Sequence, residues 1–370
     1  MAAMPPQTAE LRLTVSRTWS RRQPRGPSLS RGPMWFRDAS MDAASGVRRV
    51  GTGLLPRLSD RPSSTTAISL RGVSDRPRVV ALVPAWNAAA FIDGTLAALC
   101  AQTYPSFEIL ISVDVSSDDT AAICRAWCAR DSRVRLLVQT SRQGFVGNTA
   151  ALLREADTDY AFWAWHDDLV HPEYVSRLVP AMESASRPAM AFTDVEFHGF
   201  DGQSRVCAYT ALDGIVDPIE RGCRVLRLPD NWWVPNRGLF RPSVARQIGG
   251  FKRHARGDYK CDWPWAVHMA LLGEHVRVPG VFCRKFLKPA SLSGSWSRDV
   301  WSNLAVMQAC VREVLAADVP ATGKARLLAS MPAVVTDFAV RRLRRPSQPA
   351  GSHPYARPSG GAVASVPSPK

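Results

Sequence analysis

Two adjacent carboxylates, Asp167 and Asp168, are the residues of this chain best placed for chemistry. They follow Tyr160–Trp165, a run of aromatic and small apolar residues that is typical of a buried strand. Pro172 and Glu173 come next and favour the start of a helix. Side by side, the two acids can hold a ribose hydroxyl and one divalent cation, Mg²⁺ or Mn²⁺, whose other ligands are diphosphate oxygens. The alternative is a solvated Asp-Asp turn that caps the helix.

A third acid, Asp262, occurs much later in the chain, directly before Trp263 and Pro264. Because proline suits the first turn of a helix, Asp262 is either a helix N-cap or a general base poised by partial burial among tryptophans. Tryptophan rings also pack against the C–H faces of sugars, although buried tryptophan pairs are commonly plain core. Four tryptophans are therefore candidate walls of an acceptor site: Trp232, Trp233, Trp263 and Trp265.

Polar and aromatic residues also follow the first two expected strands. The first strand ends in Pro84, Ala85, Trp86 and Asn87, where Trp86 can lie against a nucleobase. The alternative is a core tryptophan followed by an asparagine that caps a helix. Asp114 stands at the edge of the second strand, where it can accept hydrogen bonds from a base or a ribose.

The elements that must position these residues alternate between strands and helices. This alternation indicates a parallel sheet built from βαβ units, and ligands of such sheets bind at the carboxyl ends of the strands. The Gly-containing stretch Gln143–Asn148 is expected to be a loop, and it lacks the lysine of a phosphate-binding loop. We expect strands at 78–84, 107–113, 134–139, 160–165, 190–197 and 237–241, and helices at 91–102, 119–129, 149–156, 172–183, 243–248, 263–272, 301–316 and 324–345.

The formal charge of +15 belongs to the two ends of the chain. Residues 1–78 hold 14 Arg and 5 acids, and residues 341–370 hold six basic residues and no acid. The middle of the chain therefore has equal numbers of basic and acidic residues, which argues against a nucleic-acid groove in its globular part. We expect the basic tails to be disordered, while weak contact with anionic lipid or RNA stays open.

The eight cysteines form no CxxC pair and no cadence typical of disulfides. We expect them to be reduced thiols, mostly buried, in a cytoplasmic protein. No uncharged apolar run reaches the roughly 18 residues that a membrane span needs. Any membrane association is therefore expected to be peripheral, at the inner face of the membrane through the basic tails.

Taken together, several stretches resemble the family 2 glycosyltransferases, inverting enzymes with a nucleotide-sugar-binding GT-A fold. The resemblance covers roughly residues 79–295 and keeps one order along the chain. It implies an α/β, Rossmann-like, mostly parallel central sheet flanked by helices, followed by C-terminal helices. The matching stretches are Val80–Asn87, Gln102–Glu108, Ser112–Thr120, Trp165–Asp168, Asn236–Arg241, Gln247–Phe251, Cys261-Asp262 and Ser291–Ser295.

The resemblance implies a role for each matching acid. Asp262 stands where the family has its catalytic base, and Asp167 and Asp168 stand at its metal motif. Pro84, Trp86, Asn87, Asp114 and Asp167 are the implied nucleotide-sugar contacts. Three acids of the family pattern are replaced in this chain, by Val113, Trp165 and Cys261.

The sequence therefore predicts a metal-assisted, inverting glycosyltransferase that moves a sugar from a nucleotide-diphosphate donor to an acceptor hydroxyl. The acceptor is a glycan such as a growing polysaccharide, a lipid-linked glycan or a protein. A catalytically silent nucleotide-sugar-binding module and a nucleotidyltransferase on a related sheet are the alternatives. We expect a disordered tail at 1–77, a transferase domain at 78–295 with halves 78–170 and 171–295, helices at 296–345, and a second disordered tail at 346–370.

Overall fold

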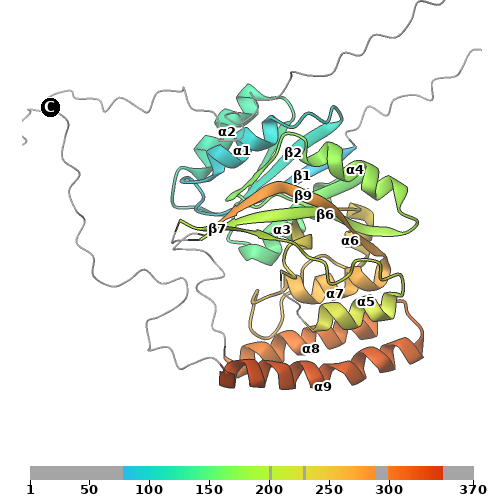
Figure 1. Ribbon diagram of the computed structural model, residues 1–370. Helices are drawn as coiled ribbons and strands as arrows, with labels where there is room; N and C mark the ends of the chain where they lie inside the picture. Colours follow the sequence, from blue (N-terminus) through green and yellow to red (C-terminus); the bar gives the residue numbers. More distant parts are fainter. Residues whose placement is uncertain (1–77, 200–201, 228–230, 288–298, 345–370) are drawn as a thin grey trace, which may run out of the picture. The chain divides into compact units, whose positions relative to one another are not determined.

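The computed structural model covers the expected transferase domain and the helices that follow it (Figure 1). Beyond Pro332 it describes only the backbone of the last helix. The two expected tails and the Ser291–Ser295 motif lie outside the described residues. The described residues are 78–199, 202–227, 231–287 and 299–344.

Four parallel strands form the first half of the sheet, in the order β3-β2-β1-β4. In the register of these strands, Val79 of β1 lies between Phe107 of β2 and Tyr160 of β4. All seven residues of β1 are buried, as the unbroken apolar run of a strand covered on both faces requires. The strands are β1 Val79–Ala85, β2 Phe107–Val113, β3 Val134–Val138 and β4 Tyr160–Trp163.

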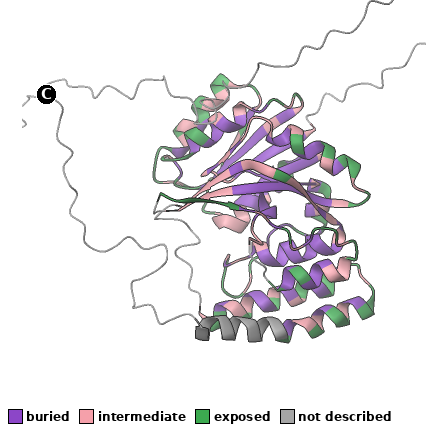
Figure 2. Cartoon of the chain, viewed as in Figure 1, coloured by how far each residue is buried: buried purple, intermediate pink, exposed green. Residues whose placement is uncertain are grey.

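Successive residues of β1 enter two different hydrophobic cores, because side chains of a strand alternate between its faces. Val79, Ala81 and Val83 join the core that also contains residues of α1 (Ile92–Cys100) and α4 (Tyr174–Ser184). Val80 and Leu82 join the second core, which is covered by α3 (Gly144–Glu155) and α6 (Pro242–Gln247). Helix α2 (Thr120–Arg130) packs beside α1 and β3. The sheet therefore has helices on both faces (Figure 2).

The second half of the sheet continues through antiparallel strands in the order β4-β8-β6-β9-β5, with β7 paired to β6. Within it, β6 and β9 run parallel. The expected α/β architecture with a mostly parallel central sheet is confirmed. The strands are β5 Asp168–Val170, β6 Pro188–His198, β7 Ser204–Cys207, β8 Leu239–Phe240 and β9 Glu274–Phe286.

Four further helices pack together beside the sheet. Helix α7 contacts α5 and α8, and α9 contacts the same two helices (Figure 1). Among the described residues, no helix combines the length and the apolar composition needed to cross a bilayer. The helices are α5 Pro218–Leu226, α7 Asp262–Leu272, α8 Val300–Ala316 and α9 Ala321–Arg344.

Strands β5, β7 and β9 and helix α5 were not expected, and helix α3 begins earlier than expected. Strand β9 was not expected, because Pro279 and Gly280 interrupt its pattern. Gly280 takes a φ of 121°, and its N–H donates to Asp194 where the register between β6 and β9 shifts. Helix α3 begins at Gly144, in the stretch that was expected to be a loop. The first N–H groups of this helix, at Gly144 and Phe145, donate hydrogen bonds to the carboxylates of Asp114 and Asp258. These bonds allow the helix to begin at a glycine.

Candidate functional site

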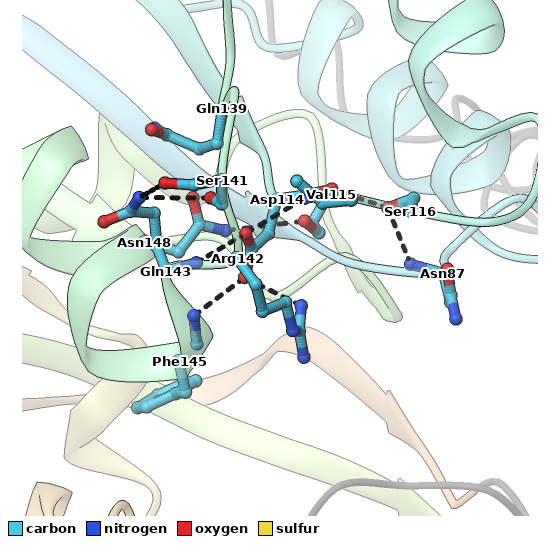
Figure 3. Close-up of polar contacts among 12 residues, drawn as sticks. Asn87, Asp114, Val115, Ser116, Gln139, Ser141, Arg142, Gln143, Phe145 and Asn148 are labelled. Atoms are coloured by element: carbon cyan, nitrogen blue, oxygen red, sulfur yellow. Dashed lines mark hydrogen bonds and ion pairs between the residues drawn. The ribbon is translucent and has the colours of Figure 1, made fainter.

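Asp114 organises the start of α3 at the carboxyl edge of the parallel strands (Figure 3). Its Oδ1 accepts hydrogen bonds from the N–H groups of Val115 (2.9 Å) and Gln143 (2.8 Å). Its Oδ2 accepts from the N–H of Gly144 (2.9 Å) and from Nη1 of Arg142 (2.7 Å). The carboxylate is 1% exposed, so these four bonds replace its lost hydration. The carboxylate of Asp114 is therefore closed to solvent, whereas the side chain of Arg142 that it holds is exposed.

The guanidinium of Arg142 stacks on the ring of Trp86, the residue that was expected to lie against a nucleobase. Its guanidinium carbon is 3.8 Å from the centre of the Trp86 ring, which is a close cation–π stack. The Trp86 side chain is 39% exposed, so it is a surface residue at the strand end and no part of the core. Sequence reasoning missed Arg142, because nothing in the sequence shows that it reaches back to Asp114 and Trp86.

Asn87 joins the loops that follow β1 and β2. Its backbone takes a left-handed φ of 45°, and its Oδ1 accepts from the N–H of Ser117 at 2.9 Å. Its own N–H donates to Oγ of Ser116 at 3.1 Å (Figure 3). Asn87 therefore positions the loop that carries Trp86, and it does not cap α1. Pro84 adds a link to the acidic segment, because its carbonyl lies 3.1 Å from Nδ1 of His166.

The two adjacent acids occupy different environments. Asp168 begins β5 and is buried, and its Oδ2 accepts from Nε of Arg237 at 2.5 Å. The two side chains are only 4% and 8% exposed. The other oxygen, Oδ1, is sealed from solvent without a hydrogen-bond partner. Asp167 is half-buried. The buried ion pair therefore corrects the expectation that both carboxylates face an ion, and it leaves Asp167 as the accessible one.

A divalent cation fits this site only with help from its substrate. Among the described residues, no three His, Cys, Asp or Glu side chains gather closely enough to hold a metal by themselves. Mg²⁺ and similar ions are commonly held by one or two carboxylates together with phosphate oxygens and water. The half-buried carboxylate of Asp167 suits that arrangement, whereas Asp168 is already neutralised by Arg237.

Asp262 is the first residue of α7, and its side chain does not cap that helix. Its Oδ2 accepts a hydrogen bond from Nδ2 of Asn236 at 2.9 Å. Burial raises the pKa of Asp262 to about 6, against the opposing influence of Lys260, Arg237 and the Asn236 bond. A carboxylate with a pKa near neutrality can accept a proton at physiological pH and still be ionised beforehand.

One short 3₁₀ turn, η2 (Pro235–Arg237), connects the two acidic regions. Asn236 holds Asp262, and the next residue, Arg237, holds Asp168. The guanidinium of Arg237 also interacts electrostatically with Asp167 and with Asp262. The adjacent acids Asp167 and Asp168 and the remote acid Asp262 are therefore gathered around one buried turn. Asn236 and Arg237 belong to a stretch that the sequence singled out, but their contacts could not be seen there.

The turn η2 is fixed by close packing against β6. A Cβ on Gly238 would lie 2.4 Å from the carbonyl oxygen of Ala191, so only glycine allows this approach. The hydroxyl of Tyr174 donates to the carbonyl of Arg237, which adds a contact from α4. These contacts hold Asn236 and Arg237 at fixed positions on the sheet.

The loop before Asp262 is tied to the start of α3. Asp258 accepts from the N–H of Phe145 at 3.1 Å, at the start of α3, and from Nε of Arg253 at 3.0 Å. Arg253 in turn donates to the carbonyl of Gln143. Asp258 and Asp114 together satisfy the first N–H groups of α3. Sequence reasoning missed Asp258, because its partner is remote in the chain.

The four candidate tryptophans separate into two pairs. Trp263 and Trp265 are 0% and 2% exposed, and the indole N–H of Trp263 donates to the carbonyl of Val225. Their burial removes these two residues from the candidate acceptor wall, because no sugar can reach them. Trp232 and Trp233 are half-buried, and the ring of Trp233 lies 4.9 Å from the guanidinium carbon of Arg237.

Part of the sequence, from the first strand to β7, matches a family of known proteins. The family model for glycosyl transferase family 2 matches residues 80–205. An uncharacterized glycosyltransferase of Haemophilus influenzae is 26% identical over 107 residues, which is 29% of this chain and 33% of that protein. Glycosyltransferase GlyG of Streptococcus pneumoniae is 28% identical over 97 residues, 26% of this chain and 32% of that protein. The chain thus spans about a third of the length of these relatives.

Solved structures show the same fold over more of the chain. S. aureus TarS 1–349 in complex with UDP-GlcNAc has a TM-score of 0.57 at 16% identity, covering 70% of this chain and 73% of TarS 1–349. Its complex with UDP has a TM-score of 0.55 at 15% identity, covering 73% and 76%. The expected GT-A-type fold is therefore confirmed. Residues 80–205 thus match the family model for glycosyl transferase family 2, and the described domain has the same fold as the TarS structures.

Proposed function

We propose that this chain is an inverting glycosyltransferase that moves a sugar from a nucleoside diphosphate to an acceptor hydroxyl. The observation that supports this most is the turn η2, which gathers the candidate base Asp262 and the acids Asp167 and Asp168 around Arg237. A base, an accessible carboxylate and a fixed positive charge near one another are the groups that such a transfer needs.

The donor nucleotide would bind at the loops that follow β1 and β2. Trp86 and Arg142 offer an exposed flat surface and free guanidinium N–H groups, while Asn87 and Asp114 hold them in place. Pro84 fixes the neighbouring segment through His166. The diphosphate would then lie toward Asp167. A divalent cation held there by Asp167 and the diphosphate would offset the charge on the leaving group.

Asp262 would act as the general base. The acceptor O–H proton moves to the Asp262 carboxylate while the acceptor oxygen bonds to the anomeric carbon. The bond between that carbon and the diphosphate oxygen breaks at the opposite side, so the configuration inverts and the nucleoside diphosphate leaves. Asn236 orients the carboxylate through its hydrogen bond to Oδ2. Proton transfer of this kind contributes roughly 10²–10⁴-fold to the rate.

The acceptor would enter beside Trp232 and Trp233, the half-buried candidates. The ring of Trp233 borders Arg237, which places it next to the acids gathered around η2. A polysaccharide, a lipid-linked glycan and a protein are the acceptor classes, and we place the reaction at the cytoplasmic side of the cell.

A donor screen tests this proposal. Purified protein would be incubated with individual UDP- and GDP-sugars, with and without Mn²⁺, and released nucleoside diphosphate would be measured by mass spectrometry. We expect release from one donor class, increased by the metal. If no nucleoside diphosphate is released from any donor, with or without candidate acceptors, the proposal that this chain is a glycosyltransferase is contradicted.

The saturated carboxylates favour a second candidate, a silent nucleotide-sugar-binding module. All bonds of Asp114 are directed inward, and Asp168 is paired with Arg237. Calorimetry separates the two functions: donor binding without any turnover would favour the silent module.

A further inference from the structure

One row of side chains crosses four neighbouring strands on the same face of the sheet, because residues paired in register point to the same face. The row consists of Asp168 on β5, Lys285 on β9, Phe197 on β6 and Arg205 on β7. The next row toward the middle of the strands is buried in the core and consists of Val170, Cys283, Val195 and Cys207. Asp168 is buried, Lys285 is half-buried and Arg205 is exposed. The first row therefore runs from the core at β5 to solvent at β7.

This row lies on the face of the sheet that carries the candidate site. Asp168 contacts Arg237 of η2. The ring centre of Phe197 is 6.2 Å from that of Trp233. The guanidinium carbon of Arg205 lies 5.2 Å from the centre of the Phe197 ring, so this side chain leans toward the same place. Neighbouring strands are about 4.8 Å apart, so the row extends about 14 Å from the acids, past Trp233.

The two positive charges of this row, Lys285 and Arg205, have no acidic partner among the residues that the structure describes. On the other face of the same strands, Glu196 pairs with Arg284 at 2.7 Å. The ion pairs of β6 and β9 within the described ranges involve neither Lys285 nor Arg205. The acid of the row itself, Asp168, is already neutralised by its contact with η2. We name Lys285 and Arg205 the cation pair.

Two cations of this kind beside a substrate site are suited to bind an anion. Arginine offers a planar fork of N–H groups that matches a phosphate or a carboxylate, and lysine offers a point charge on a flexible stem. The backbones of the cation pair are about 10 Å apart, which is two strand spacings, and both side chains are long enough to reach one anion above the ring of Phe197. We propose that Lys285 and Arg205 bind a phosphate or carboxylate group of the acceptor, which makes the acceptor an acidic glycan. This inference rests on the proposed transfer.

Position favours the acceptor over the donor as the source of the anion. The diphosphate of the donor would lie at Asp167, next to β5, whereas Arg205 is three strands away from Asp168. Phe197, between the two cations, contacts Trp233, which borders the proposed entry of the acceptor. An acceptor held by its anionic group at the cation pair would therefore pass Trp233 on its way to the acids around η2.

Binding of defined oligosaccharides to the full-length protein tests this proposal. The probes are hexagalacturonate, which carries carboxylates, a phosphorylated maltohexaose, and unmodified maltohexaose as the neutral control, each titrated in calorimetry without a donor. We expect the wild type to bind at least one charged probe at least about tenfold more tightly than the neutral one, and less tightly in high salt. The variant Lys285→Gln/Arg205→Gln should lose this preference, while its affinity for UDP or GDP should stay within about twofold of the wild type.

Two further variants separate charge from packing. Lys285→Arg/Arg205→Lys keeps both positive charges and should retain most of the preference for charged probes. Loss of the preference in this variant would contradict a site that acts through charge. Arg125→Gln/Arg130→Gln removes two exposed cations of α2 and should bind all probes as the wild type does.

Three other outcomes would overturn the proposal. Equal wild-type affinity for the charged and the neutral probes is the first. The second is a preference for charged probes that the glutamine variant keeps, because the anion would then bind elsewhere. The third is a loss of UDP or GDP affinity in the glutamine variant, because the cation pair would then hold the diphosphate of the donor. The oligosaccharide titrations contain no sugar donor, so a negative result there leaves the proposed transfer standing, and the donor screen tests that transfer independently.

Discussion

Replacing Asn236 by alanine should shift the pH dependence of sugar transfer. Asn236 is 2% exposed, and its amide donates to Asp262 at 2.9 Å. This bond stabilises the ionised carboxylate, so its loss raises the pKa of Asp262 above its present value of about 6. A hydrogen bond to a charged group is worth about 1.5–3 kcal/mol, and one pKa unit corresponds to about 1.4 kcal/mol. The structure therefore predicts an upward shift of about one to two units.

The assay is kcat/KM for donor turnover measured across pH. A general base must be ionised to act, so the wild-type rate should fall as pH drops through about 6. In Asn236→Ala the acid limb should move toward pH 7–8, on the order of the shift worked out above, with activity recovered at higher pH. Gln139→Ala removes an amide that donates to the hydroxyl of Ser112 on β2, and it serves as the matched control.

Two results would refute this reasoning. A wild-type profile without an acid limb near pH 6 would remove Asp262 as the titrating base. An Asn236→Ala profile that is lower at every pH but keeps the wild-type limb would make Asn236 a packing residue only.

Three further predictions concern the same acids. The carboxyl of Asp262 binds a proton more tightly in the folded chain (about 6) than at its ordinary pKa of 3.8. Its burial therefore costs stability increasingly as pH rises from about 4 to 6, and Asp262→Asn should stabilise the protein by up to about 3 kcal/mol at pH 8, but hardly at pH 4, in urea unfolding. Arg237→Gln should lower the free energy of unfolding by about 3–5 kcal/mol in urea unfolding, because it leaves Asp168 charged and buried without its partner. The double variant Arg237→Met/Asp168→Leu should recover much of that loss. Equal stability of the single and the double variant would contradict a stabilising ion pair. Asp167→Asn should abolish the effect of Mn²⁺ on donor affinity in calorimetry, and a retained metal effect would exclude Asp167 as the ligand.

The first half of the fold could be predicted from sequence, because its signals are local. The strand Val79–Ala85 is an unbroken apolar run, and helices α1 and α2 alternate with β1 and β2 at the spacing of βαβ units. The second half depends on pairing between remote segments. Strand β9 contains Pro279 and Gly280 and is held by its register with β6, which no local pattern reveals. Helix α5 carried a usable signal, since Asp217 caps it and Pro218 begins it.

The candidate site divides in the same way. Residue type and order along the chain were enough to select Trp86, Asp114 and Asp262. Burial was not predictable, and burial decides that Trp263 fills the core and that Asp168 forms an ion pair. The partners Arg142, Asn236, Arg237 and Asp258 are polar residues whose importance comes only from contacts across long separations in the chain.

The most direct test of the proposed mechanism is transfer by Asp262→Asn compared with its affinity for the donor. The variant keeps the shape of the side chain and an oxygen that can accept from Asn236, but it cannot take a proton. We predict donor affinity close to wild type in calorimetry, with transfer reduced roughly 10²–10⁴-fold. Transfer near the wild-type rate would contradict the role of Asp262, and with it the proposal that η2 assembles the reacting groups.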